Sequence, residues 1–123
     1  GADASGRGEV DLPHLRGRRR VGGDAAPKLK LALGRPIRGR RVVLSHGLAA
    51  PLYSEHARVL RGELILNGRD SFSFQMDPDV MTKTEIDLGR SHRVRSIELT
   101  VLEVMDGAVG SSAVGFSEVE VYR

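Results

Sequence analysis

The dipeptide Asn67-Gly68 constrains the fold of this chain more than any other feature of its sequence. It lies between two runs of strand-forming residues in the stretch ELILNGRDSFSFQM. Asn and Gly tolerate the positive φ angles of a tight hairpin turn. After the turn, Phe72, Phe74 and Met76 alternate with polar residues. The stretch therefore predicts two adjacent antiparallel strands, each with one buried face.

The same alternation of apolar and polar side chains recurs along much of the chain. It is present in KLKLAL (28–33), VLRGELIL (59–66), KTEIDL (83–88) and RVRSIELTVLEV (93–104), and RRVVLSH (40–46) adds a short apolar run. In the segment 93–104, Leu102 and Val104 fall out of step with Ile97, Leu99 and Val101, so we expect a bulge or a strong bend near Val101. Short strands without a 3.6-residue apolar stripe predict an all-β fold, an antiparallel β-sandwich.

Three segments are expected to depart from this strand pattern. GRSH (89–92) is expected to connect two strands, and YSEHARVL (53–60) is the one helical candidate, with room for a turn or two. The first ten residues, GADASGRGEV, have no periodic apolar positions. Residues 1–23 are therefore expected to form a linker or an arm that is ordered in part, and residues 24–123 a single sandwich domain.

Composition and motifs exclude several classes of function. The chain of 123 residues has no cysteine, which rules out disulfides, thiolate zinc sites and a cysteine nucleophile. It has no signal-peptide pattern and no apolar run of about 18 residues that would predict a membrane span. It also has no Gly-x-Ser-x-Gly elbow, phosphate loop or dinucleotide fingerprint, so the domain is not expected to be an enzyme.

Arginines are clustered in two short stretches, HLRGRRRVGG and GRPIRGRRVV, and the formal net charge is +3. Basic patches of this kind supply most of the non-specific affinity for nucleic acids. However, aromatic residues do not alternate with these arginines, and no recognition-helix pattern accompanies them. A solvated strand face or an arm is the favoured interpretation, and nucleic acid is an unlikely partner.

The order of the segments resembles that of discoidin-like domains, the galactose-binding-like sandwiches that include coagulation-factor type C domains and many bacterial carbohydrate-binding modules. The resemblance rests on PKLKLALGRPIRGRRVVLSHG, LRGELILNGR, TEIDLGRSHRVRSIELTVLEVMDG and VGFSEVEVY, and covers about residues 28–122. It implies a galactose-binding-domain-like jelly roll that binds ligands through loops at one end. Similar modules bind galactosides, arabinans, lipid head groups or proteins, so the fold alone does not name the ligand.

Two functions from different classes follow from this resemblance. The first is a non-catalytic carbohydrate-binding module that binds a polysaccharide or glycan and belongs to a larger bacterial carbohydrate-active enzyme. Such a parent protein, a glycoside hydrolase or glycosyltransferase, would be secreted or held in the cell envelope. The second is a structural or protein-interaction sandwich that packs against the catalytic domain of its parent protein.

The candidate ligand-binding residues lie in the stretch SHGLAAPLYSEHARV. Only this loop pairs an aromatic side chain with several polar ones, namely His46, Tyr53, His56 and Arg58. Protein sites for sugars combine an aromatic surface with groups that hydrogen-bond to hydroxyls, so these four residues are expected to bind carbohydrate. The alternative for each of them is structural: the tyrosine would then cover the core, and the histidines would lie at the surface or bond within the fold.

The closing stretch AVGFSEVEVYR predicts a strand that buries Val119 and Val121 and directs Glu118 and Glu120 to the other face. The resemblance implies that Glu118 helps to bind a structural Ca²⁺ ion, with Asp106 in the preceding loop as a weaker candidate. Backbone carbonyls would complete the oxygen ligands. The alternative is that both glutamates are solvated or paired with arginines.

Overall fold

The computed structural model describes residues 4–11, 18–20, 26–47, 58–105 and 113–123. Within these ranges the chain forms seven strands: β1 (Ala4–Asp11), β2 (Arg18–Arg20), β3 (Lys28–His46), β4 (Arg58–Leu66), β5 (Asp70–Gln75), β6 (Thr84–Met105) and β7 (Ala113–Tyr122). Every pairing between them is antiparallel. Nowhere in the described residues is there a helix long and apolar enough to cross a lipid bilayer.

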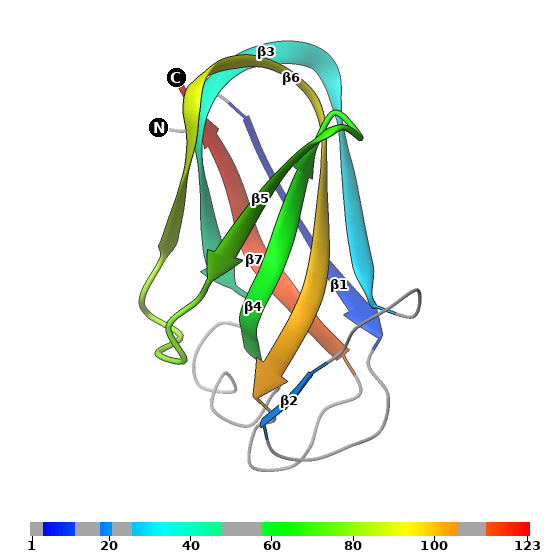
Figure 1. Ribbon diagram of the computed structural model, residues 1–123, viewed down its shortest axis with the longest axis vertical. Helices are drawn as coiled ribbons and strands as arrows, with labels where there is room; N and C mark the ends of the chain where they lie inside the picture. Colours follow the sequence, from blue (N-terminus) through cyan, green and yellow to red (C-terminus); the bar gives the residue numbers. More distant parts are fainter. Residues whose placement is uncertain (1–3, 12–17, 21–25, 48–57, 106–112) are drawn as a thin grey trace.

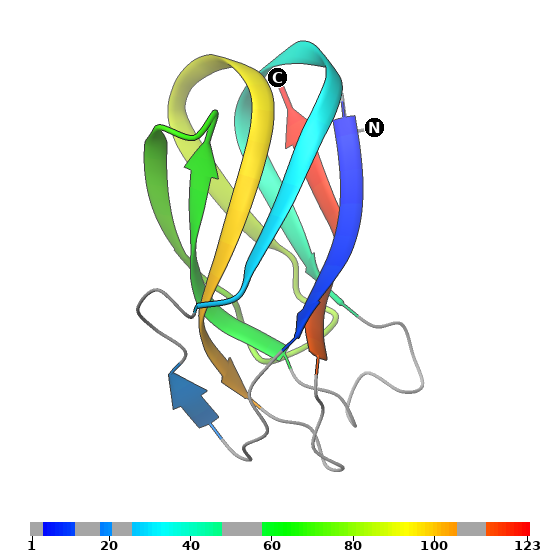
Figure 2. The same cartoon turned by 90° about the vertical axis from the view of Figure 1, so that its right-hand side faces the viewer.

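Two long strands, β3 and β6, contribute to both layers of the sandwich because each runs through one layer, bends over and returns through the other (Figure 1). The first part of β3 pairs with the last part of β6, which also pairs with β4, and β4 pairs with β5. The last part of β3 pairs with the first part of β6 and with β7, which pairs with β1. Figure 2 shows that both bends lie at the same end of the molecule.

Glycines allow β3 and β6 to bend without leaving the sheet. Gly89 has a φ of 80°, in the left-handed region that favours glycine, and its N–H donates a hydrogen bond to Asp87 Oδ1 at 2.8 Å. Gly39 approaches Val121 so closely that a Cβ atom on it would overlap the valine side chain. The prediction that residues 89–92 connect two separate strands is therefore wrong, because β6 passes through them as one bent strand.

The core lies between the two layers and is built mainly from aliphatic side chains. Val119 and Val121 are 2% and 1% exposed, which confirms the predicted inner face of β7. The predicted inward-facing residues of β6 are also buried. The predicted bulge is confirmed, because Gly62 of β4 pairs with Val101 whereas Arg61 pairs with Glu103, which leaves the intervening residue of β6 without a partner on β4. Burial of each large apolar side chain favours folding by about 1.5–3 kcal/mol.

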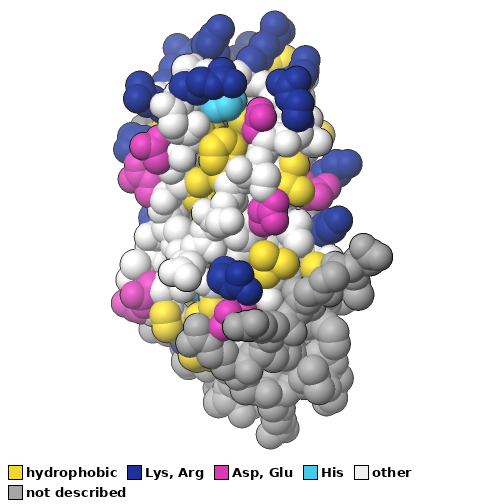
Figure 3. All heavy atoms as spheres, in the orientation of Figure 1, with side chains coloured by type: hydrophobic (Ala, Val, Ile, Leu, Met, Phe, Trp, Pro, Cys, Tyr) yellow, Lys and Arg dark blue, Asp and Glu magenta, His cyan; other side chains and the backbone are white. Residues whose placement is uncertain are grey.

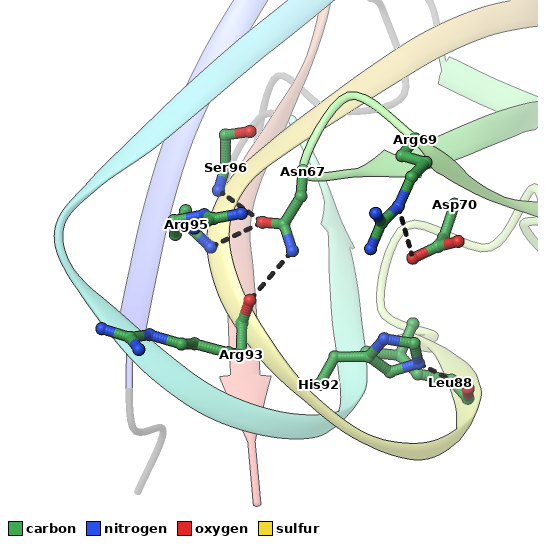
Figure 4. Close-up of polar contacts among 8 residues, drawn as sticks. All are labelled: Asn67, Arg69, Asp70, Leu88, His92, Arg93, Arg95 and Ser96. Atoms are coloured by element: carbon green, nitrogen blue, oxygen red, sulfur yellow. Dashed lines mark hydrogen bonds and ion pairs between the residues drawn. The ribbon is translucent and has the colours of Figure 1, made fainter.

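The Asn67-Gly68 turn joins β4 to β5 as predicted. Both residues have positive φ angles, 55° and 70°, and the N–H of Arg69 donates to the carbonyl of Leu66 at 3.0 Å. The asparagine side chain then fastens this turn to β6. Its Oδ1 accepts the N–H of Arg95 at 2.7 Å, and the neighbouring N–H on β6 approaches the same oxygen at 3.2 Å. The β4–β5 hairpin is thereby held against the bend of β6 (Figure 4).

The N-terminal segment, expected to be a linker or an arm ordered in part, contains two strands. Residues 4–11 form β1, which pairs with β7, and residues 18–20 form β2, which pairs with the end of β6. Backbone hydrogen bonding requires no apolar periodicity, and β1 pairs with the edge that β7 would otherwise leave exposed. The expected helical turn at 53–60 is wrong where it can be checked, because Arg58–Leu60 belong to β4; residues 53–57 lie outside the described residues.

Candidate functional site

The predicted ligand-binding residues that the structure describes lie at the end of the sandwich opposite the bends of β3 and β6 (Figure 1). We call this end, where β3 and β6 finish and β4 begins, the loop end. His46 is the last residue of β3, and Arg58 is the first residue of β4. Both contact the same short turn, Asp77–Pro78. Tyr53 and His56 lie outside the described residues.

His46 is a buried residue that anchors this turn. His46 is only 3% exposed, and its Nε2 lies 2.6 Å from the carbonyl oxygen of Asp77. Burial lowers the pKa of His46 below its ordinary value, and the nearby charge of Arg58 lowers it further, although the bond to the carbonyl acts in the opposite direction. A neutral imidazole with its hydrogen on Nε2 therefore donates to the turn.

Arg58 holds the other half of the same turn. Its Nη1 donates to the carbonyl of Pro78 at 2.9 Å, and its Nη2 approaches Met105 Sδ at 3.4 Å. In the described part of the chain, three buried polar atoms at this end have no hydrogen-bond partner: Ser45 Oγ, His46 Nδ1 and Arg58 Nε. Such atoms destabilise a fold by about 1–3 kcal/mol each. His46 and Arg58 thus hold the Asp77–Pro78 turn in place. His46 Nδ1 and Arg58 Nε have no hydrogen-bond partner among the described residues.

The structure does not bring together a calcium site from the residues that it describes. Glu118 is exposed on β7 and pairs in register with Ser45 of β3. Within the described ranges no three Asp, Glu, His or Cys side chains lie close enough together to hold a metal ion. Asp106 lies outside those ranges. Since Ca²⁺ takes six to eight oxygen ligands, Glu118 as a ligand stays a prediction.

Glu120 differs from both alternatives weighed for it. It is 7% exposed, accepts a hydrogen bond from the Tyr122 hydroxyl at 2.6 Å, and lies 3.4 Å from Lys83 Nζ. The Tyr122 bond lowers the pKa of Glu120, and Lys83 lowers it further, against the raising effect of burial. The glutamate is therefore neither solvated nor paired with an arginine. The arginine at this position, Arg41, instead stacks over the Tyr122 ring at 4.9 Å from its centroid.

A second candidate site, which the sequence reasoning missed, is a groove between β5 and the bend of β6. Its volume is about 480 Å³. It is lined by Asp70, Ser71, Phe72, Leu88, Gly89, Arg90 and His92. The rings of Phe72 and His92 meet edge to face, with centroids 6.0 Å apart, and His92 Nε2 lies 3.2 Å from the Leu88 carbonyl (Figure 4).

This groove, the Phe72–His92 groove, places an aromatic ring beside a carboxylate, a hydroxyl and a guanidinium. That combination is suited to a polyhydroxylated ligand. Phe72 alternates with polar residues, which predicts that it lies on a strand and points into the core. Its half-burial results from its place on β5, which lies at the edge of its layer, and that position is not readable from the sequence.

Comparison with known proteins gives a match in structure alone. No protein-family model matches the sequence, and no curated protein matches it. Among solved structures, the chain is similar to CpGH89CBM32-5 from Clostridium perfringens, determined in complex with GalNAc-β-1,3-galactose. The TM-score is 0.57 at 10% sequence identity, over 97% of this chain and 95% of the other. This chain has the β-sandwich fold of that module. The predicted all-β fold, an antiparallel β-sandwich, is thereby confirmed.

Proposed function

We propose that this domain is a non-catalytic carbohydrate-binding module. The observation that carries the proposal is the correspondence of the fold, over 97% of the chain, with a CBM32 module bound to a galactose-containing disaccharide. The orientation of the two histidines that the structure describes supports a binding role over a catalytic one. His46 and His92 each direct Nε2 to a backbone carbonyl, whereas a general base needs a hydroxyl or water to deprotonate.

The proposed ligand site is the loop end. Tyr53 would supply the aromatic surface and His56 a hydrogen bond, while His46 and Arg58 hold the Asp77–Pro78 turn. Glu118, with Asp106 as a second ligand, is retained as the proposed site of a structural Ca²⁺ ion. If that ion binds the native state, a chelator lowers the melting temperature of the unaltered protein and leaves Glu118→Gln unchanged.

The wider setting of the domain is part of the same proposal. The parent protein would be a bacterial glycoside hydrolase or glycosyltransferase that acts outside the cell or in the cell envelope. The alternative function, a sandwich that packs against its parent's catalytic domain, is favoured by one observation. An apolar cavity of about 590 Å³ opens between β1 and the first part of β3, with Leu31, Leu33 and Ile37 among its lining residues. A neighbouring domain would cover such a surface.

Binding to neutral glycans tests the proposal. We expect retardation of the protein by a neutral galactan in affinity electrophoresis and titratable binding of GalNAc-β-1,3-galactose. Tyr53→Ala should weaken that binding by about 1–2 kcal/mol, or roughly 5- to 30-fold, because a stacked aromatic contact is lost. Tyr122→Ala is the matched control, since Tyr122 bonds to Glu120 on β7 and should affect stability without affecting affinity.

Two further results would change the proposal. If Asp70→Asn weakens binding while Tyr53→Ala does not, the sugar occupies the Phe72–His92 groove and the loop-end site is wrong. If no neutral glycan in a broad panel binds, the carbohydrate-binding function is wrong, and the apolar cavity between β1 and β3 becomes the surface to test with the parent's catalytic domain.

A further inference from the structure

The bends of β3 and β6 carry charge of one sign. In residues 34–41 and 88–95, which we call the arginine arch, every charged side chain is an arginine. These residues are Arg35, Arg38, Arg40 and Arg41 on β3, and Arg90, Arg93 and Arg95 on β6. Lys and Arg side chains gather at this end of the molecule in the space-filling view (Figure 3). An excess of like charge in one place produces a strong local field.

The strand register makes this arrangement unfavourable for the fold itself. Arg38 pairs directly with Arg93 across the β3–β6 ladder, and both are exposed. Like charges opposite each other on antiparallel strands destabilise the sheet. Arg41 has a partner in Glu85 at 3.6 Å. Within the described residues, the other six side chains of the arch form no ion pair: Arg35, Arg38, Arg40, Arg90, Arg93 and Arg95.

The arch is hollowed as well as charged. A basin of about 800 Å³ lies between the two bends and the end of the chain that follows β7. It is lined by Arg35, Pro36, Ile37, Arg38, Arg40, Ser91 and Arg123. No carboxylate side chain is among these residues. Guanidinium groups form paired, charge-assisted hydrogen bonds with carboxylates, sulfates and phosphates, so the basin presents donors for an oxyanion.

The backbone that carries these arginines is fixed by polar contacts. Asn67 Nδ2 donates to the carbonyl of Arg93 at 2.9 Å, and Asn67 Oδ1 accepts the N–H of Arg95. His92, which pairs with Gly39 across the ladder, bonds to the carbonyl of Leu88 within the same bend. Figure 4 shows these contacts inside the arch, with the Arg93 side chain directed away from them. A fixed backbone reduces the entropy lost when a ligand binds.

We propose that the arginine arch binds an acidic polysaccharide, a glycan chain that carries carboxylate or sulfate groups. It is a second binding surface, at the opposite end of the sandwich from the loop end, and it does not depend on the proposed neutral-sugar site. Repeated acidic groups along one chain match repeated arginines along two strands. The ligand would also relieve the repulsion between Arg38 and Arg93.

Other polyanions fit the arch less well. Single-stranded nucleic acids stack their bases on exposed aromatic rings, and residues 34–41 and 88–95 contain no Phe, Tyr or Trp, while His92 is 8% exposed. Binding to an anionic membrane usually combines charge with inserted apolar side chains. Ile37 and Pro36 are the apolar residues that line the basin, and Ile37 is half-buried.

The test compares two double variants, each of which loses two positive charges. The substituted residues lie on β3 or on its neighbour β6. Arg38→Gln/Arg93→Gln removes the facing pair, whereas Lys28→Gln/Lys30→Gln removes two exposed cations at the far end of β3. With polygalacturonate as the probe, the arginine variant should lose affinity by about tenfold or more and the lysine variant by less than about twofold. Added salt should weaken binding to the unaltered protein.

The same experiment includes the results that would overturn the proposal. Equal losses in both double variants would mean that only net charge matters. Tighter binding of a single-stranded oligonucleotide or of anionic phospholipid vesicles than of polygalacturonate and dextran sulfate would identify a different partner. The arginine variant should melt at the same temperature or higher, because repulsion is removed, and a lower melting temperature would make the pair structural. The arginine variant should bind neutral galactan as tightly as the unaltered protein does. A failure of the arginine-arch proposal can therefore be told apart from a failure of the proposed neutral-sugar site.

Discussion

At the loop end, His46 and Arg58 turn inward and bond to the backbone, whereas six of the seven arginines of the arginine arch form no ion pair with any residue that the structure describes. His46 and Arg58 each serve a carbonyl of the Asp77–Pro78 turn. Arg38 and Arg93 face each other with no acidic partner in the described residues. Buried polar side chains that stabilise a fold mostly bond within it, whereas an exposed cluster of like charge is accessible to a ligand. The described side chains therefore point to the arch, and not only to the loop end, as a binding surface.

The largest expected effect is at the bend of β3, in the arginine arch, and depends on the close contact at Gly39. Gly39→Ala should destabilise the protein by about 1–3 kcal/mol in urea denaturation, because its Cβ overlaps Val121 and the arch must shift. Gly34→Ala is the matched control on the same strand, since a Cβ there meets nothing within 4 Å. It should be neutral or stabilising by about 0.4–1 kcal/mol. Equal effects of the two variants would show that the close contact at Gly39 does not determine the bend.

This difference between the glycines also shows how far the sequence predicts the fold. Period-two alternation and the Asn67-Gly68 turn predicted which faces are buried, because both depend on neighbours within one or two residues. They did not predict that β3 and β6 stay continuous, since that depends on Gly39 meeting Val121 on a strand far along the chain. The pairing of β1 with β7 was not predicted either, because backbone hydrogen bonds leave no apolar pattern in the sequence.

The candidate sites were predictable only in part. The sequence placed His46 and Arg58 together because they are close along the chain, but not their shared bonds to a turn that follows β5. It grouped the arginines of residues 35–41 as a basic patch. It did not show that Arg93 faces Arg38, because the register between β3 and β6 is set by the bends of both strands.

A second, smaller effect concerns pH at the loop end. The folded state lowers the pKa of His46, chiefly through burial, so below about pH 6.5, the ordinary histidine value, the unfolded chain binds a proton more readily than the fold does. Stability should therefore fall as pH decreases from about 6.5 towards the folded pKa. His46→Gln should flatten this part of the melting-temperature profile. An unchanged slope in the variant would mean that His46 is not the buried neutral group described.

The smallest expected effect concerns Glu120, a buried carboxylate bonded to Tyr122, whose ring lies under Arg41 of the arch. Its folded pKa is lowered by the Tyr122 hydroxyl and then by Lys83, so it stabilises the fold above about pH 4.3, the ordinary glutamate value, and this contribution is lost as pH falls through the folded pKa. Tyr122→Phe removes the hydroxyl and keeps the ring under Arg41. Urea denaturation should show a difference between variant and unaltered protein that is larger at neutral pH than in acid. A difference independent of pH would assign the role of Tyr122 to packing and not to its hydrogen bond with Glu120.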